Sequence, residues 1–366
     1  MLEQVVVVMN KMKQISLFLV AFLITACDNP NKQVVHNNVI TLLTDSISVP
    51  TYEIIGDTLP LDALWPTDIA IVDSFLLIGQ HKDDKLIHIY SKNSLLKLGS
   101  FIEKGGGPYD VNLWNGFNQY WVENNEAKLL IQSYPQYVAT LNLNKTLNQQ
   151  EVVFDEKFNF SNDSAKAIFL RSNVVYKVKD NFLMSRSTDR IKGTTDYNLS
   201  FQWFDYEKDE IKNIVYSTDQ AIYPFPFLYA PGGMCYNVNQ GKICFAFRYI
   251  NAFALFDIDK GSSIQLIPNN DITDLKEYVN EQKDAVFFQD VASSNKFVYL
   301  ATYHGIKQNE TEKEGVTIEV YDWNGNHISK IRLKEPIYYI AVDSEDEYLY
   351  TVVSDGGIKK YKLPKM

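Results

Sequence analysis

The chain has 366 residues, of which 46% are hydrophobic, and it contains 23 Tyr and 21 Phe. This composition excludes a largely disordered chain, and the length exceeds what one ordinary core serves, so we expect two domains or one repetitive architecture. The formal net charge is −10 and the Lys and Arg residues form no run. Nucleic acid is therefore not expected as a partner, because binding along phosphates requires clustered positive charge.

The amino terminus has the pattern of a bacterial signal peptide. Met12-Lys13 precedes an apolar run from Ile15 to Thr25, which is too short for a bilayer-spanning helix of about 20 residues. The run ends in Leu23-Ile24-Thr25-Ala26-Cys27, which is typical of a lipobox, and polar residues follow at once. We expect residues 1–26 to be removed, with Met12 as the true start, and Cys27 to be lipidated. An ordinary secretory peptide is the alternative.

This pattern also predicts location and organisation. Residues 27–38 are expected to form a tether, and residues 39–366 a single domain. The N-terminal lipid would hold the protein in the cell envelope, with the domain in the periplasm or at the cell surface, since each buried CH₂ contributes about 0.8 kcal/mol. Inner or outer membrane, the face and the oligomeric state are left open.

Two further cysteines, Cys235 and Cys244, flank a predicted hairpin. A two-residue loop at Asn239-Gln240 would place them opposite each other, whereas a three-residue loop ending at Gly241 would stagger them. An exported protein meets an oxidising compartment, but disulfides require strict geometry. Buried free thiols are the preferred interpretation.

One pattern of strands and turns recurs along the body of the chain. Its third strand has the form apolar, polar or small, apolar, aromatic, followed by Asp or Ser, as in Ile87–Ser91, Phe201–Asp205, Phe253–Asp257 and Ile318–Asp322. These segments alternate or nearly alternate, as half-buried strands do, and turn residues follow each one. Four-stranded units of about 40–60 residues are typical of propeller blades.

The spacing predicts an all-β, six-bladed β-propeller of four-stranded antiparallel blades, with seven blades as the alternative because the third is long. The predicted blades span residues 66–107, 108–155, 165–217, 222–268, 285–334 and 337–364. The last has only three clear strands, so we expect an N-terminal strand from Val39–Ile55 to complete it and close the ring. Helical spacing predicts a short helix over Asp271–Lys283, between blades 4 and 5.

A lipobox, six degenerate blades and the turn Glu103-Lys-Gly-Gly-Gly-Pro-Tyr-Asp110 together resemble the TolB-like six-bladed propeller lipoproteins of Bacteroides-type bacteria. Relatives often carry Gly-x-Gly-Pro-Gly-Glu at this turn, where this chain has Tyr109-Asp110 in place of Gly-Glu. The resemblance extends over residues 40–364. It implies the fold and the location but no established activity.

The sequence predicts neither a metal site nor a cofactor, and it shows no catalytic set. The glycine-rich turn lacks the Lys, Ser or Thr and following helix of a phosphate loop, so we interpret it as a connector between blades. Asp322-Trp-Asn-Gly-Asn326 begins like a calcium loop but lacks its later ligands and is interpreted as a hairpin turn. No histidine lies near a Gly-x-Ser-x-Gly motif, and no two have zinc-ligand spacing.

The predicted ligand-binding face follows from propeller geometry. Loops that join second to third strands, and one blade to the next, surround one mouth of the central channel. The alignment of blades predicts that these loops carry the candidate ligand-binding residues His81, Arg186, Arg248, Tyr249, His304, Gly106 and Pro108. Arg248-Tyr249 follows an aromatic strand and suits an anionic or sugar-like ligand; ordinary solvated loop residues are the alternative.

These observations favour a membrane-tethered, non-enzymatic module that binds a protein, a peptide or a glycan. A polysaccharide lyase or hydrolase at the channel mouth is the first alternative, which two converging carboxylates or a Tyr/His/Arg cluster would favour. An architectural subunit of an envelope complex is the second, which a large exposed apolar patch would favour.

Overall fold

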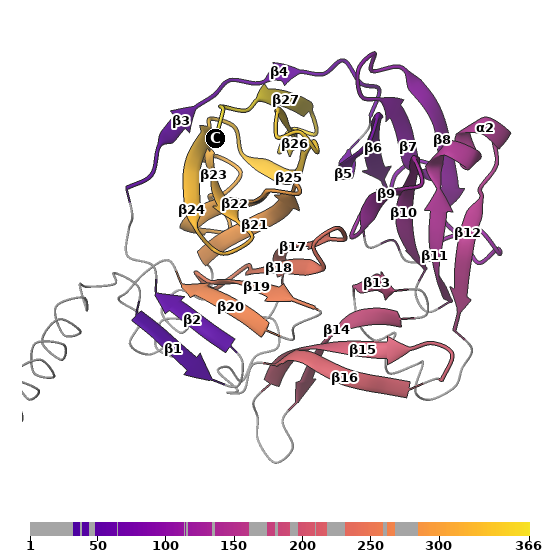
Figure 1. Ribbon diagram of the computed structural model, residues 1–366. Helices are drawn as coiled ribbons and strands as arrows, with labels where there is room; N and C mark the ends of the chain where they lie inside the picture. Colours follow the sequence, from indigo (N-terminus) through magenta and orange to yellow (C-terminus); the bar gives the residue numbers. More distant parts are fainter. Residues whose placement is uncertain are drawn as a thin grey trace, which may run out of the picture.

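The computed structural model describes residues 32–36, 39–43, 48–63, 65–112, 114, 116–133, 136–160, 174–179, 182–190, 197–208, 210–217, 231–258, 262–267 and 285–366. Their strands form six sheets arranged as blades around a central channel (Figure 1). The predicted six-bladed, all-β propeller is thereby confirmed. The predicted helix at Asp271–Lys283, the signal peptide and Cys27 lie outside the described residues.

Each blade pairs its strands in chain order, with the first strand nearest the channel. Blade 1 consists of β5 (Pro66–Val72), β6 (Phe75–Gln80), β7 (Lys85–Ser91) and β8 (Lys97–Glu103). Blade 2 consists of β9 (Tyr120–Glu123), β10 (Glu126–Ser133), β11 (Tyr137–Asn142) and β12 (Phe154–Asn159). Blade 3 consists of β13 (Val175–Lys179), β14 (Phe182–Arg190), β15 (Tyr197–Asp205) and β16 (Glu210–Ser217). The nine-residue strands β14 and β15 account for part of the length of blade 3.

Blades 4 and 5 follow the same order, and blade 6 takes its outermost strand from the N-terminal segment. Blade 4 consists of β17 (Pro231–Asn237), β18 (Lys242–Phe247), β19 (Phe253–Asp257) and β20 (Ser262–Ile267). Blade 5 consists of β21 (Ala285–Ser293), β22 (Phe297–Lys307), β23 (Val316–Asp322) and β24 (His327–Leu333). Blade 6 contains β25 (Ile337–Val342), β26 (Tyr348–Val353) and β27 (Ile358–Lys362). One short helix, α2 (Leu143–Gln149), follows β11 and is capped by the Asn142 side chain, which accepts a hydrogen bond from the Lys145 amide.

The N-terminal segment runs along the outer edges of three blades in turn. β1 (Lys32–His36) pairs with β2 (Val39–Leu43), which adds in parallel to β20 of blade 4, and β3 (Thr51–Glu53) adds in parallel to β24 of blade 5. β4 (Asp57–Thr58) then pairs antiparallel with β27 and completes blade 6 (Figure 1). The described strands thus begin inside the segment predicted as a tether.

The prediction that a strand within Val39–Ile55 completes the last blade was wrong in position. Ring closure does use an N-terminal strand, but β4 supplies it. Blade 6 adjoins blade 1 in the ring. The chain therefore passes the outer edge of blade 6 just before it enters blade 1 at β5. The earlier strands β2 and β3 reach only blades 4 and 5.

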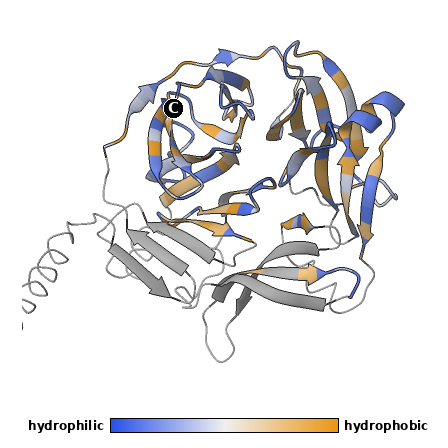
Figure 2. Cartoon of the chain, in the orientation of Figure 1, coloured by the Kyte–Doolittle hydropathy of each residue, from blue (hydrophilic) through white to orange (hydrophobic). Residues whose placement is uncertain are grey.

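The hydrophobic core lies between neighbouring blades. One buried cluster joins Leu77 and Ile89 of blade 1 to Leu129 and Ile131 of blade 2, and others join blades 2 and 3, 4 and 5, 5 and 6, and 6 and 1. Strands such as β6 are buried along their whole length, because both faces of a blade pack against neighbours, and hydrophobic residues recur along the blades in Figure 2. Within the described residues, no helix is long and apolar enough to span a bilayer.

Blades 4 and 5 meet closely at Gly232-Gly233 of β17. A Cβ added to Gly232 would lie 2.2 Å from the Phe288 carbonyl oxygen, and one added to Gly233 would lie 2.4 Å from the Val291 nitrogen. Gly233 also has a φ of +146°, a backbone conformation that other residues rarely adopt. Both glycines are therefore required for the inner strands of these blades to pack.

We predict that Gly233→Ala lowers the free energy of unfolding by about 3 kcal/mol, because the methyl group would meet the β21 backbone and the backbone conformation would be strained. Gly106→Ala is the control, since the nearest atom to its Cβ, Gln136 Nε2, is 3.9 Å away. Chemical denaturation of both variants checks this. Equal stabilities would contradict the close approach of β17 and β21.

Candidate functional site

The first strands of four blades carry the same irregularity. In β5, β17 and β25 the pairing with the second strand shifts by one residue at the start of the strand, and β21 has such a shift further along, between Phe288 and Asp290. The residues that follow this β-bulge are Asp68, Gly233, Asp290 and Tyr339, and all four line the central channel. Bulges re-aim side chains, and here they direct equivalent positions of different blades toward one region of the channel.

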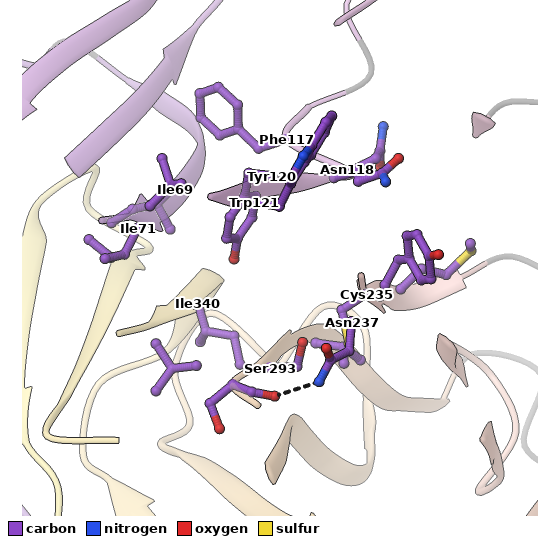
Figure 3. Close-up of a pocket in the computed structure, with 18 of the residues that line it drawn as sticks. Ile69, Ile71, Phe117, Asn118, Tyr120, Trp121, Cys235, Asn237, Ser293 and Ile340 are labelled. Atoms are coloured by element: carbon purple, nitrogen blue, oxygen red, sulfur yellow. Dashed lines mark hydrogen bonds between the residues drawn. The ribbon is translucent and has the colours of Figure 1, made fainter. Parts of the chain in front are cut away.

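These residues belong to the wall of a cavity of about 870 Å³ inside the channel. The lining combines acidic, amide and aromatic side chains with Arg248. Figure 3 shows Phe117, Tyr120 and Trp121 on one side and Cys235, Asn237, Ser293 and Ile340 on another. The aromatic members are Phe117, Tyr120, Trp121, Tyr236 and Tyr339.

Two carboxylates that line the cavity, Asp68 and Asp290, also join neighbouring blades. Asp68 of blade 1 accepts hydrogen bonds from the amides of Ile69 and of Phe117, which directly precedes blade 2. Asp290 of blade 5 accepts one at 2.7 Å from the Ile340 amide of blade 6. Each carboxylate thus fixes the first strand of its blade to the next blade.

Both carboxylates are costly to ionise in this position. Burial raises the pKa of Asp68 to about 6 despite the two amide donors. Burial, and then the charge of Asp68, raises the pKa of Asp290 well above its usual range, while Arg248 lowers it. Burial followed by the charges of Asp68 and Asp290 raises the pKa of Tyr339 to about 12. These mutual effects agree with the position of Asp68, Asp290 and Tyr339 in the lining of one cavity.

Tyr120 of β9 extends this group from blade 2. Burial raises the pKa of its phenol, and Cys235, Asp68 and Asp290 raise it further. In Figure 3 the Tyr120 hydroxyl points into the cavity. The carboxylates of Asp68 and Asp290 and the phenols of Tyr120 and Tyr339 thus come from blades 1, 5, 2 and 6. Asp73 and Tyr236 also line the cavity, and Arg248 follows the end of β18.

Among the predicted ligand-binding residues whose side chains the structure describes, Arg248 alone lines this cavity. His81 lies in the exposed turn after β6, and its pKa is lowered by partial burial and by Lys104. The Tyr249 hydroxyl donates to Gln308 Oε1 at 3.4 Å. The binding roles of these residues stay predictions.

Two of these residues lie in strands, where the sequence had predicted loops. Arg186 is within β14 and pairs with Phe201 of β15. His304 is within β22, which continues beyond the predicted end of the strand, and its Nε2 lies 3.7 Å from Glu319 Oε1. Long hairpin strands in blades 3 and 5 therefore extend past the positions at which the shorter blades turn.

Gly106 and Pro108 lie in the connector between blades 1 and 2, as predicted. The Gly107 amide donates to Asp110 Oδ2 at 2.9 Å, and the Lys157 ammonium donates to the Pro108 carbonyl. That ammonium also lies 4.1 Å from the centre of the Tyr137 ring. The connector is thus held by residues of its own neighbourhood, and Asp110 fills the turn that the glycines leave open.

No metal site is present among the described residues, since they contain no group of three His, Cys, Asp or Glu side chains that could hold an ion. The Asp322 turn is a hairpin, as predicted: Asp322 Oδ1 accepts from the amides of Asn324 and Asn326, and Gly325 has a φ of +87°. Its carboxylate is thereby occupied within the turn.

Sequence reasoning missed Asp68, Asp290, Tyr120 and Tyr339 as site residues. A signal was available in two of them: Asp68-Ile-Ala and Asp290-Val-Ala place an acidic residue at the same point of an otherwise apolar inner strand. Tyr120 carries no comparable signal, because aromatic residues are frequent throughout the strands.

The fold and the cavity define a six-bladed β-propeller with a polar and aromatic channel. A sequence model of the TolB-like six-blade propeller family matches residues 53–345. The chain belongs to this family.

Solved structures show similarity at the level of the fold. A member of the DUF4221 family from Bacteroides vulgatus is 12% identical, with a TM-score of 0.54 over 85% of this chain and 97% of that one. U3-55K, 12% identical, matches with a TM-score of 0.43 over 81% of this chain and 80% of that one. The WD40 repeats of RRP9, also 12% identical, match with a TM-score of 0.44 over 82% and 80%. No curated protein matches the chain.

We predict that Asp68 makes stability depend on pH. Its pKa of about 6 exceeds the unfolded value, so the folded state binds the proton more tightly, and its ionisation opposes folding as pH rises. Relative to Asp68→Asn, the wild type should gain up to about 3 kcal/mol of unfolding free energy between about pH 7 and 4. Denaturation at several pH values measures this difference.

Asp73→Asn is the matched control, since Asp73 is an exposed carboxylate in the turn that ends the same strand. The control should follow the pH profile of the wild type. A profile for Asp68→Asn that parallels the wild type would show that Asp68 is not buried in this way.

Proposed function

We propose that this protein is a membrane-tethered envelope lipoprotein whose propeller binds a glycan in the channel cavity. The observation that carries the binding proposal is the convergence of Asp68, Asp290 and Tyr339 on one cavity through bulged first strands of different blades, with Arg248 in the same lining. A protein or a peptide is the other ligand class that the sequence leaves open.

The lining supports a carbohydrate because it pairs two kinds of group. Carboxylates and amides accept and donate hydrogen bonds to sugar hydroxyls, and aromatic rings pack on the C–H faces of a pyranose. The cavity provides both, with Asp68, Asp290 and Gln289 beside Tyr120 and Trp121. Its volume of about 870 Å³ lies in the range of small-molecule sites.

Trp65 offers a second aromatic surface close to the start of β5. Its side chain is 59% exposed, and the Lys82 ammonium lies 4.4 Å from its ring centre. Its φ of +55° is unusual for a bulky residue and must be sustained by its surroundings. An exposed indole held three residues before Asp68 is a suitable platform for a further sugar unit.

The tether proposal rests on the sequence of the first 27 residues. Leu23-Ile24-Thr25-Ala26-Cys27 follows a short apolar run, and Lys32, where β1 begins, comes five positions after the lipidated residue. A lipid on Cys27 would therefore hold the propeller close to the membrane surface, with N-terminal strands attached to blades 4, 5 and 6.

We predict that Cys27→Ser abolishes fatty-acid incorporation and releases the protein from the membrane fraction. Metabolic labelling with a palmitate analogue, followed by fractionation, measures both. Cys235→Ser is the control and should keep the label. A wild-type chain that is processed but unlabelled would indicate an ordinary secretory peptide.

We predict that Asp290→Asn and Tyr339→Phe each weaken glycan binding at least about tenfold, because a buried carboxyl or phenol group that hydrogen-bonds the ligand is removed. An array of polysaccharide fragments identifies the ligand, and calorimetry measures its affinity. Asp84→Asn, which changes an exposed carboxylate outside the cavity, should bind as the wild type does. Unchanged affinity in both cavity variants would place the binding site elsewhere.

The same residues favour a second function, a polysaccharide lyase or hydrolase. Paired carboxylates perform acid and base steps in glycoside hydrolysis, and a Tyr with an Arg suits proton abstraction beside a carboxylate. The array experiment separates the two functions. New reducing ends or unsaturated products formed by the wild type, and lost in Asp290→Asn, would identify an enzyme; binding without products supports the binding module.

A further inference from the structure

The two internal cysteines face each other across the first hairpin of blade 4. The loop contains four residues, so Asn237 pairs with Lys242 and Cys235 pairs directly with Cys244. Both belong to one buried cluster between blades 4 and 5, which places their side chains on the same face of the sheet. They are free thiols in the structure, and their side chains are hydrogen-bonded to each other.

The two thiols differ in access. Cys235 lines the channel cavity and is 9% exposed, whereas Cys244 is fully buried. Burial, followed by its hydrogen bond to Cys235, raises the pKa of the Cys244 thiol. Because Cys235 lines the cavity and Cys244 lies behind it, Cys235 is the residue that a molecule in the channel meets first.

We propose that Cys235 and Cys244 form a cross-strand disulfide, in which Cys235 reacts first with an external disulfide and Cys244 completes the bond. Residues directly opposite in an antiparallel pair have Cα separations of about 4.5–5.5 Å, which is within the range that a disulfide spans.

The chemistry balances with a small aliphatic disulfide as oxidant. The Cys235 sulfur attacks one sulfur of the oxidant, which breaks the S–S bond and releases one thiol that takes the Cys235 proton. The Cys244 sulfur then attacks Cys235 in the mixed disulfide, and the second released thiol takes the Cys244 proton. Two cysteine thiols are oxidised to one disulfide, and the oxidant is reduced to two thiols.

The bond would brace the wall of the cavity. Cys235 lies two residues after Gly233, whose backbone packs against Asp290 and Val291 of β21. A disulfide between β17 and β18 at this point would fix β17, the strand that packs against Asp290 of β21. Closing a short loop also restricts the unfolded chain, so the oxidised protein should unfold at a temperature higher by a few degrees.

The test is peptide mapping of the full chain after exposure to hydroxyethyl disulfide. Lys242 is the only tryptic site between the two cysteines, so digestion of the oxidised protein leaves two peptides joined through sulfur. We expect this joined species, with neither cysteine open to alkylation after denaturation. Two alkylatable thiols after oxidation, or after refolding in a mixture of the disulfide and its thiol, would overturn the proposal.

Two variants test the order of reaction. Cys244→Ser should trap one mixed disulfide on Cys235, whereas Cys235→Ser should leave Cys244 unmodified while the protein is folded, as judged by circular dichroism. Accumulation of the mixed disulfide in the wild type, without the joined peptides, would show that the two sulfurs cannot meet. Wild-type mapping decides the main proposal even if a variant does not fold.

Discussion

Hydrogen bonds between polar side chains at the inner strands and the backbone of the next blade hold the ring of the propeller together. Asp68 binds the Phe117 amide, Gln119 exchanges two bonds with the Lys177 backbone, and Asp290 binds the Ile340 amide. Asn237 adds a bond at 3.2 Å to the Ser294 carbonyl. The described strands of neighbouring blades share no ladder. These side chains and the apolar clusters therefore set the relative positions of the blades, and with them the shape of the channel.

Using carboxylates for two of these bonds has a consequence for function. An amide side chain would join the blades without charge, as Gln119 does, whereas Asp68 and Asp290 place two acidic groups in a buried cavity. Their raised pKa values mean that protons, Arg248 or a bound ligand must compensate the charge. Perturbed carboxylates that line a cavity are a recognised mark of functional sites, although such groups also occur in structural networks.

The N-terminal segment and the inner ring are structurally separate. β2, β3 and β4 add only to the outermost strands of blades 4, 5 and 6, whereas the cavity is lined mainly by the innermost strands and the residues beside them. The proposed N-terminal tether would therefore act on the rim of the propeller. The cysteine pair belongs to the inner side, between β17 and β18, so an oxidative change there would affect the cavity wall directly.

The sequence by itself determined the class of fold and the approximate extent of most blades, because strand alternation and turn residues are local and recur along the chain. The end of blade 2 was wrong, since β12 continues to Asn159, past the predicted end at residue 155. Third strands such as Phe253–Asp257 and Ile318–Asp322 lie within the predicted segments. Only the tertiary structure decided three features: which N-terminal strand closes blade 6, that Cys235 faces Cys244, and that Asp68, Asp290, Tyr120 and Tyr339 share a cavity. All three features depend on strand register or on how the ring closes, and neither can be read from a single segment of sequence. In addition, a β-bulge shifts the register by one residue and redirects side chains, yet it leaves no distinct local pattern in the sequence.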